Sequence, residues 1–496
     1  MFYIKTWQIQ HGTCVNIKNS FTLLKRIGLD SVVYGLGTAL GKAVPFLLLP
    51  FYTKYLEPSD YGVIEIMSIL SAFLTSLINL GLDSAQSFFF FKFNSGKENF
   101  QQQYVSTILF FRLIWGGFFL LIFCFIAPFF NSFLFKSKFD LTIFYISFSS
   151  LFLYLIMSQG QEIFRLEFKS FNYILVSFFY SLLSSIISLA GVLLFPNIKV
   201  IAFLSGPAIA SFFMAFFVWY SNRKYIIFSI PKMDRVKEIC KYGIPLFPTD
   251  FFFYLVTSVD KWLINIFLGS TALGLYAVAS KFAMIVTLAV EVFRKAWWPI
   301  SLELMHQDQK LQTEDLLNYV TKIYFGLGIS FLIYLAFFSE LLINIMTAPQ
   351  YRSVYLLIGI LGFQSLFNGS DLIFSFGIWR AGKTYINLIC ITVTAILNFL
   401  LCYILIPLYG ITGAAISTSI AYFLWNIFSI FISIKYYQIR FDYLFFLVQI
   451  LLGVFAIIVI NYKILSNLYL FAFINFIIVI MFFLAFKQNF SRKNNV

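Results

Sequence analysis

The sequence predicts an all-α polytopic membrane protein of about 14 transmembrane helices, arranged as two six-helix repeats followed by two C-terminal helices. Three observations lead to this fold class. Hydrophobic residues make up 60% of the 496 residues and charged residues only 11%, whereas soluble domains carry roughly 25% charged residues. The apolar residues form continuous runs of about 20 residues, the length that a helix needs to cross the hydrocarbon core. These runs do not alternate over about ten residues, as membrane barrel strands do.

The first 30 residues are polar and lack the apolar core and cleavage site of a signal peptide, so we expect a cytoplasmic tail. The predicted spans that follow are 31–54, 61–84, 105–130, 139–160, 172–194, 199–221, 243–266, 272–300, 318–346, 353–378, 384–406, 411–434, 441–462 and 466–486. With the N-terminus inside, 22 of the 35 Lys and Arg residues fall in cytoplasmic connections and six in outer ones. This distribution predicts that both termini are cytoplasmic.

The longest basic connection, Arg223 to Lys241, lies near the middle of the chain and predicts a linker between two halves. Tyr55 to Gly62 aligns with Phe267 to Gly274 at an offset of 212 positions, and Pro196 and Pro407 are 211 apart. Such a repeat predicts two six-helix units that enter the membrane in the same sense. The predicted domains are a tail at 1–30, an N-terminal lobe at 31–221, a linker at 222–242, a C-terminal lobe at 243–434, and two additional helices with a cytoplasmic tail at 435–496.

Basic residues lie inside several predicted spans, where each costs about 2.5–3.5 kcal/mol at the bilayer centre. They are Lys42, Arg112, Lys261, Lys281, Arg294, Lys295 and Lys322. Lys42 lies near the middle of its span, too deep for its amine to reach the interface. Lys322 lies near a span end, and we expect it to extend to the interface. Most of these residues are expected either to extend to the interface or to face a hydrated interior.

Three predicted helices carry a polar face at helical spacing. The faces comprise Ser31, Gly35, Thr38, Lys42 and Pro45 in the first span, Glu65, Ser68, Ala72, Thr75, Asn79 and Asp83 in the second, and Asp250, Thr257 and Lys261 in the seventh. Together they predict a hydrated cavity shared by both halves, with Lys42, Asp250 and Lys261 among its charged groups. Helix packing is the alternative interpretation of the small and hydroxyl residues.

The eighth span carries Glu291, Arg294 and Lys295 at the spacing i, i+3, i+4, which favours a local ion pair and ligand contact equally. Asp260 precedes Lys261 but points about 100° away from it. We therefore expect Asp260 to act either as a structural partner for Lys261 from another helix or as a polar group in helix packing. The acidic candidates for a coupling ion or for the cavity are Glu65, Asp83, Asp260 and Glu291.

Gly377 to Thr384 matches the phosphate-binding pattern GxxxxGK[ST] letter for letter. That loop needs a preceding strand in a soluble nucleotide domain, whereas here it joins two predicted spans, so we expect no ATP binding. Five scattered cysteines and two histidines indicate neither a metal site nor a catalytic pair. We therefore expect no cofactor and no catalytic residue. Membrane topology accounts for the net charge of +14 better than nucleic-acid binding does.

Three segments then resemble a known family: Asp260 to Tyr276, Phe293 to Pro299, and Asn398 leading to Ile406 to Thr418. They are similar to polysaccharide biosynthesis transporters, the O-antigen or Wzx-type flippases of the MATE-like MOP superfamily. The resemblance spans about residues 30–437 and implies two six-helix lobes around a cationic cavity. It also implies movement of an undecaprenyl-pyrophosphate-linked oligosaccharide from the inner to the outer leaflet. Many relatives place an Arg after Asp83, where this chain has Ser84.

The predicted function is therefore a flippase of the bacterial inner membrane, not an enzyme, with alternating access of the two lobes. Its predicted substrate-binding residues are Lys42, Asp250, Lys261 and Arg294. The expected partners are a lipid-linked oligosaccharide of O-antigen, capsule or exopolysaccharide, membrane lipid, and a polymerase or other glycan-assembly proteins, but no nucleic acid. A cation-coupled multidrug exporter and an oligosaccharide polymerase are the alternatives. The coupling ion and the sugar composition stay open.

Overall fold

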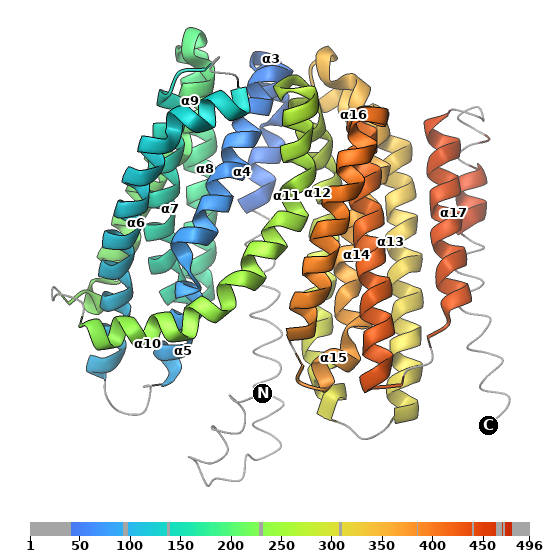
Figure 1. Cartoon of the computed structure of the whole chain (residues 1–496). Coiled ribbons are helices and arrows are strands. Elements are labelled where there is room, and N and C mark those ends of the chain that lie inside the picture. Colours follow the sequence, from blue (N-terminus) through green and yellow to red (C-terminus); the bar gives the residue numbers. More distant parts are fainter. Residues whose placement is uncertain are drawn as a thin grey trace.

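The computed structural model describes residues 41–92, 98–135, 139–227, 232–306, 310–383, 385–438, 441–462, 469 and 472–478. Within these ranges every regular element is a helix, so the all-α fold class is confirmed (Figure 1). Eleven helices of the described part are long and apolar enough to cross a membrane, and they cover the second to the thirteenth predicted spans. The first and last predicted spans lie partly outside the described residues.

The helices of the first half pack together on one side of the molecule (Figure 1). They are α3 (Leu49–Tyr55), α4 (Pro58–Asn79), α5 (Leu82–Lys92), α6 (Glu98–Phe135), α7 (Thr142–Leu166), α8 (Ser170–Leu194) and α9 (Lys199–Ser221). At the start of α4, the Asp60 carboxylate accepts a hydrogen bond from the backbone N–H of Glu57 at 2.9 Å. Pro58 has no N–H to leave unpaired in the first turn. This sequence fixes where α4 begins.

The second predicted span, 61–84, is not one helix as expected, because α4 ends at Asn79 and α5 begins at Leu82. Leu80 and Gly81 between them adopt positive φ values of 45° and 73°, which end a right-handed helix. A Cβ on Gly81 would lie 2.4 Å from the carbonyl oxygen of Gly243, so this break lies directly against the end of the central linker.

The second half contains two long helices, α12 and α13, and one still longer element, α16. Its helices are α11 (Phe247–Leu268), α12 (Ser270–His306), α13 (Lys310–Met346), α14 (Tyr355–Phe374), α15 (Phe376–Arg380), α16 (Tyr385–Tyr436) and α17 (Tyr443–Asn461). As one straight helix, α16 would measure about 78 Å, more than twice the hydrocarbon thickness. Gly410, with φ 61° and ψ −142°, divides it into two antiparallel arms (Figure 1). The arms correspond to the predicted spans 384–406 and 411–434.

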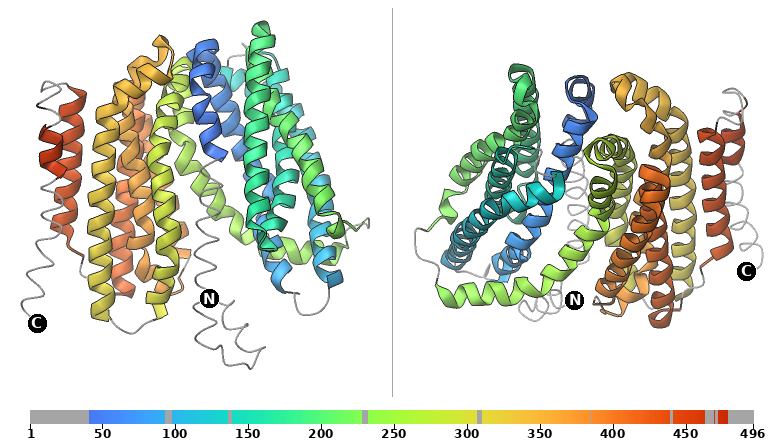
Figure 2. Two further views of the ribbon diagram at one scale, coloured as in Figure 1. Left: turned by 180° about the vertical axis from the view of Figure 1, so that it is seen from behind. Right: turned by 45° about the horizontal axis from the view of Figure 1, so that its top comes forward.

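The two halves lie side by side and meet through α4, which packs against α11 and α12. Their ribbons are close at the end where α11 passes into α12, and they diverge toward the linker helix α10 (Met233–Gly243) (Figures 1 and 2). At the close end, the Tyr351 hydroxyl donates to the carbonyl of Leu56 at 2.9 Å. The Asn265 amide donates to the carbonyl of Leu134 at 3.1 Å. The structure therefore has one end at which the halves are tied together.

Gly62 of α4 and Gly274 of α12 form a reciprocal contact at this tied end. A Cβ on Gly62 would lie 1.8 Å from the carbonyl oxygen of Ser270, and a Cβ on Gly274 would lie 1.8 Å from that of Pro58. In the repeat, Gly274 is equivalent to Gly62 and Ser270 is equivalent to Pro58, each 212 positions later in the chain. The two contacts are therefore counterparts of each other. Equivalent residues therefore meet as they do across a two-fold axis. The exact domain boundaries stay a prediction.

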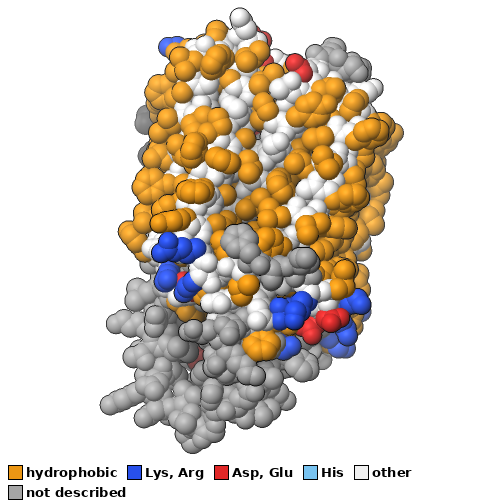
Figure 3. Space-filling view, turned by 90° about the vertical axis from the view of Figure 1, so that its left-hand side faces the viewer, with side chains coloured by type: hydrophobic (Ala, Val, Ile, Leu, Met, Phe, Trp, Pro, Cys, Tyr) orange, Lys and Arg blue, Asp and Glu red, His pale blue; other side chains and the backbone are white. Residues whose placement is uncertain are grey.

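The outer face of the first half has the polarity of a membrane-embedded surface (Figure 3). Hydrophobic side chains cover most of its length, and Lys and Arg side chains gather near the linker end. The linker α10 contributes Arg235, Lys237 and Lys241 at that end. Such a band of apolar surface bounded by cations is typical of a protein that spans a bilayer.

Candidate functional site

A cavity of about 200 Å³ lies where the two halves meet, bounded by α4, α11, α12 and α14. Its charged lining residues are Glu65, Asp260, Lys261 and Lys281. Hydroxyl and amide side chains complete the polar lining: Thr257, Tyr276, Ser280, Thr287, Gln364 and Ser365. Ionisable groups from both halves thus converge at one site inside the membrane-spanning region, where each of them is costly and marks a functional candidate.

Glu65 and Lys261 form an ion pair across the two halves, with 2.5 Å between Glu65 Oε1 and Lys261 Nζ. Their side chains are only 11% and 21% exposed. Lys281 also interacts electrostatically with Glu65. Two ammonium groups thus lie near the Glu65 carboxylate, while Asp260 is the second acid among the four charged lining residues.

Asp260 does not pair with the ammonium of its neighbour Lys261. Its Oδ2 atom accepts a hydrogen bond from the Tyr276 hydroxyl at 2.6 Å, and its Oδ1 atom accepts from the backbone N–H of Lys261 at 2.8 Å. The residue is only 2% exposed. Asp260 thus ties α11 to α12, which corresponds to the helix-packing interpretation of this residue.

The other predicted residues occupy different places along α12. Lys295 interacts electrostatically with Glu291 and with Lys42 of the first span. Arg294 points elsewhere, since its Nη1 atom donates to the carbonyl of Asn368 on α14 at 3.2 Å. Among the described residues, no ion pair joins Arg294 to Glu291. The local ion pair considered for this segment is therefore wrong for Arg294.

Lys281 lines the cavity, although it was predicted only as one of the basic residues inside spans and not as a substrate-binding residue. It shares one face of α12 with Lys295, because their separation of 14 residues is close to four helical turns. That spacing is the signal that would have identified it. Asp250 belongs to the first turn of α11, and its side chain lies outside the described residues.

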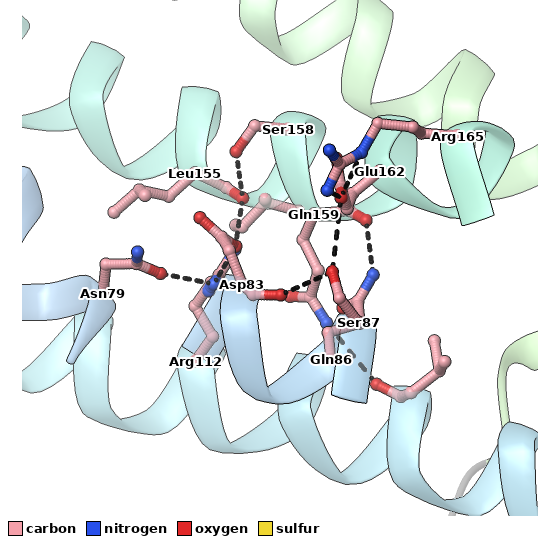
Figure 4. A network of polar contacts seen from close by, with 12 residues as sticks. Asn79, Asp83, Gln86, Ser87, Arg112, Leu155, Ser158, Gln159, Glu162 and Arg165 are labelled. Carbon is pink, nitrogen blue, oxygen red and sulfur yellow. Dashed lines mark hydrogen bonds and ion pairs between the residues drawn. The ribbon is translucent and has the colours of Figure 1, made fainter. Parts of the chain in front are cut away.

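A second polar cluster lies in the first half, around the fully buried Arg112 of α6 (Figure 4). Its Nη2 atom donates to Asp83 Oδ1 at 2.8 Å and to Asn79 Oδ1 at 2.9 Å, and its Nη1 atom donates to the carbonyl of Leu155 at 3.0 Å. The cation absent from the position after Asp83 is thus supplied by another helix. Because Asp83 lies on α5, the break after Asn79 brings both acceptors to one guanidinium.

The same cluster continues toward α7 through a second acid (Figure 4). The Ser87 hydroxyl donates to Glu162 Oε1 at 3.4 Å, and Arg165 forms an ion pair with the same carboxylate. Gln86 donates to the carbonyl of Gln159 at 3.1 Å. α5 therefore joins α6 and α7 through polar contacts near the linker end.

Two other sequence expectations concern charged or phosphate-binding residues. The Lys322 ammonium forms an ion pair at 2.9 Å with Asp442, the residue that caps the start of α17, and its side chain is only 10% exposed. The segment that matches the phosphate-binding pattern begins inside α15, where the Gly377 N–H donates to Ser433 Oγ at 2.8 Å. A helix rather than a strand precedes its last residues, so the segment lacks the context of a nucleotide-binding loop.

Comparison with known proteins decides the family. The family model described as polysaccharide biosynthesis protein matches residues 53–356. The chain belongs to this family. It is 25% identical over 291 residues to a protein of the Lsg locus of Haemophilus influenzae, which covers 58% of the chain and 68% of that protein. It is 23% identical over 207 residues to the capsular polysaccharide biosynthesis protein CapF of Staphylococcus aureus, or 41% of the chain and 52% of CapF.

Solved structures show that this polysaccharide biosynthesis protein has the fold of MOP-superfamily transporters. The lipid II flippase MurJ, in an inward closed conformation, matches with a TM-score of 0.70 at 17% identity and covers 92% of the chain and 100% of MurJ. An inward-facing MATE-family multidrug transporter matches with a TM-score of 0.65 at 13% identity, over 82% of the chain and 97% of the transporter. The chain thus shares its fold with these membrane transporters.

Proposed function

We propose that this protein is a flippase that moves a polyprenyl-diphosphate-linked oligosaccharide across the bacterial inner membrane. The observation that carries the proposal is the cavity between the halves, in which the ammonium groups of Lys261 and Lys281 both lie near the carboxylate of Glu65. A diphosphate cannot enter hydrocarbon unaided, and it needs cations in a hydrated path. The membership of the chain in a polysaccharide biosynthesis family supports a glycan as the group that the lipid carries.

The ion pair between Glu65 and Lys261 allows substrate binding to weaken the contact between the two halves. A diphosphate that reaches the cavity competes with Glu65 for both ammonium groups, because it carries more negative charge than one carboxylate. Lys261 then turns from Glu65 to the substrate, and one tie between α4 and α11 is released. Lys42 and Lys295, which interact electrostatically with each other and of which Lys295 also interacts with Glu291, supply further positive charge on the substrate path. Arg294, held by Asn368, contributes to the field of the site rather than to direct contact.

The same arrangement supports alternating access as the mechanism of transport. With α10 and both termini in the cytoplasm, as the basic residues favour, the tied end faces outward. The substrate enters from the side of the linker, where the halves diverge (Figure 2). Release of the tied end, which includes the Gly62–Gly274 contact, opens the site to the other leaflet.

A multidrug exporter is the second candidate, because a MATE-family transporter shares the fold with a TM-score of 0.65. The two functions differ in what accumulates when the protein is absent. Depletion in the native host, followed by labelling of lipid-linked glycan with a membrane-impermeant probe, separates them. A flippase leaves complete single units on the cytoplasmic side. Units that accumulate outside indicate a polymerase, and unchanged glycan indicates the exporter.

Complementation with variants links the result to the site. Wild-type protein and Arg352→Gln should restore glycan export, because Arg352 is exposed in the turn at the tied end and does not line the cavity. Lys281→Gln should fail to restore glycan export, although it removes one positive charge just as Arg352→Gln does. Lys281→Arg, which keeps the positive charge, should restore part of the export. Equal complementation by Lys281→Gln and Arg352→Gln would contradict the assignment of the cationic cavity.

A further inference from the structure

A second cavity, of about 240 Å³, lies entirely within the first half, between α4, α7, α8 and α9. Five hydroxyl side chains line it: Ser68, Ser71, Thr75, Ser147 and Ser150. No charged side chain lines it among the described residues. Its volume is several times the roughly 30 Å³ that one water molecule occupies in the liquid, so it has room for a small ring. The cavity is polar without being an ion site.

The hydroxyl groups offer acceptors rather than donors to a ligand. Ser68 donates its hydrogen to the carbonyl of Ile64 at 2.9 Å, and Ser147 donates to that of Ile143 at 2.8 Å. Thr75 donates to the carbonyl of Ser71, also at 2.9 Å. Each hydroxyl oxygen keeps lone pairs that no backbone group uses. The matching ligand is an uncharged molecule rich in O–H donors.

Two tyrosines add aromatic surface to the same cavity. The rings of Tyr154 and Tyr180 lie 5.4 Å apart with an interplanar angle of 49°. Tyr154 keeps 41% of its surface exposed, although it lies inside a helical bundle. An aromatic face packs well against the apolar C–H face of a sugar ring, while hydroxyl groups meet its polar edge. Acceptor oxygens and aromatic faces together are the chemistry that recognises a saccharide.

The position of the cavity relates it to the cationic site. Ser68 lies three residues after Glu65 on α4, so their side chains share a face of that helix. Thr75 lies about 15 Å farther along the same helix from Glu65. A lipid headgroup held at Lys261 and Lys281 therefore has its attached sugars within reach of the hydroxyl-lined cavity.

We infer that the cavity formed by Ser68, Thr75, Ser147, Tyr154 and Tyr180 is a saccharide subsite. It binds an uncharged sugar residue of the lipid-linked glycan whose diphosphate occupies the cationic cavity. This inference rests on the proposed function. It assigns recognition of the diphosphate to the interface between the halves and recognition of sugar to the first half alone.

The test compares two probes on purified protein in lipid nanodiscs: undecaprenyl diphosphate without sugar, and lipid-linked glycan extracted from the host. Thr75→Val and Ser147→Ala remove one hydroxyl each from different helices with little change in shape. Each should weaken binding of the glycan-bearing lipid about threefold to tenfold, and should leave the sugar-free lipid within about twofold. Lys281→Gln should weaken both probes alike.

Ser76→Ala is the matched control, because Ser76 neighbours Thr75 and donates to the carbonyl of Phe73 but does not line the cavity. It should bind both probes as the wild type does. Equal effects of Thr75→Val and Ser147→Ala on the two probes, or no effect on either, would overturn the subsite while wild-type binding of both lipids still supports the flippase. Failure of the wild type to bind either probe would overturn both proposals.

Discussion

Glu65 of α4 and Lys261 of α11 join the two halves of the chain through an ion pair, with 2.5 Å between the carboxylate oxygen and the ammonium nitrogen. The residues are 196 positions apart in sequence. Tyr254 of α11 adds a hydrogen bond to the carbonyl of Ile69 on α4 at 2.6 Å, two turns of α11 before Lys261. A charged contact and a neutral contact thus fix the same two helices relative to each other.

Loss of this ion pair should lower stability in a way that depends on both partners. Glu65→Gln and Lys261→Gln should each reduce the free energy of unfolding by about 1.5–3 kcal/mol, because both groups are largely buried and charged. The free energy of unfolding of the double variant should be no lower than that of the less stable single variant. Thermal unfolding of the four proteins in one detergent measures this. Strictly additive losses would show that the two side chains do not interact.

Substitution of Arg112 should destabilise the protein more than substitution of its acidic partner. Arg112→Met leaves Asp83, Asn79 and the carbonyl of Leu155 without their donor, at a cost of about 3–5 kcal/mol. Asp83→Asn keeps an acceptor oxygen and affects a side chain that is 45% exposed, so about 1 kcal/mol is expected. The yield of monodisperse protein and its unfolding temperature report both effects.

Arg165→Met serves as the control for Arg112, because Arg165 also pairs with an acid but its side chain is 51% exposed. Its loss should cost about 0.5 kcal/mol or less. If Arg165→Met were as unstable as Arg112→Met, the burial of Arg112 would not be the reason for its effect.

Enlargement of Gly62 or Gly274 should separate the halves at their tied end. An added Cβ would lie 1.8 Å from a backbone carbonyl of the other half in each case, which no rotation of a side chain relieves. Spin labels at the exposed positions Lys54 and Arg352, in a background without native cysteines, measure the separation. Gly62→Ala and Gly274→Ala should each move the label distances to longer values.

Gly117→Ala is the matched control for the interface glycines. Gly117 lies inside α6 and has no atom within 4 Å of the added Cβ. It should leave the label distances unchanged, because alanine also favours the helix. Unchanged distances in Gly62→Ala would mean that the tied end accommodates the methyl group without opening.

Glu167, at the end of α7, should make stability depend on pH. Burial raises the pKa of its carboxyl, but hydrogen bonds from Lys169, Lys224 and Tyr225 outweigh burial and hold the pKa below its ordinary value of 4.5. The stabilisation is therefore fully present above pH 4.5 and is lost as the pH falls through the lower folded-state pKa. The unfolding temperature of Glu167→Gln should lie below that of the wild type at pH 7, and the difference should vanish in acid.

Lys224→Gln tests the same network from the cationic side. Lys224 lies 2.5 Å from Glu167 Oε1, so its loss should also lower the unfolding temperature at neutral pH. The difference from the wild type should again close in acid, since a protonated Glu167 no longer attracts the ammonium. A difference that persists below the folded-state pKa would assign the effect to packing.

The sequence predicted the helices well because each span must satisfy its own backbone within the bilayer. Long apolar runs are therefore direct evidence of helices, and the turn at Gly410 falls between two predicted spans. The break at Leu80 and Gly81 was missed because Asn79 and Asp83, which flank it, were assigned to the polar face of one continuous helix. Only the packing against Gly243 shows why the chain turns there.

The candidate site was predicted in part. Helical spacing brought Glu65 and Lys261 to cavity-facing positions on their own helices, but their pairing depends on how two halves pack, which one helix cannot reveal. Asp83 and Arg112 are 29 residues apart on helices that the break after Asn79 brings together. Lys281 shares a face of its helix with Lys295, but its place near Glu65 depends on the packing of the two halves.

The reciprocal packing of Gly62 and Gly274 limits how far the two halves can drift apart in sequence. Two identical copies related by a two-fold axis would place the same glycine on both sides of that axis, and two segments of one chain show that arrangement here. A larger residue on either side obstructs the same shared surface, so neither half can change alone at this point. The contact between the two equivalent segments, at Gly62 and at Gly274, therefore constrains the residue type at both positions.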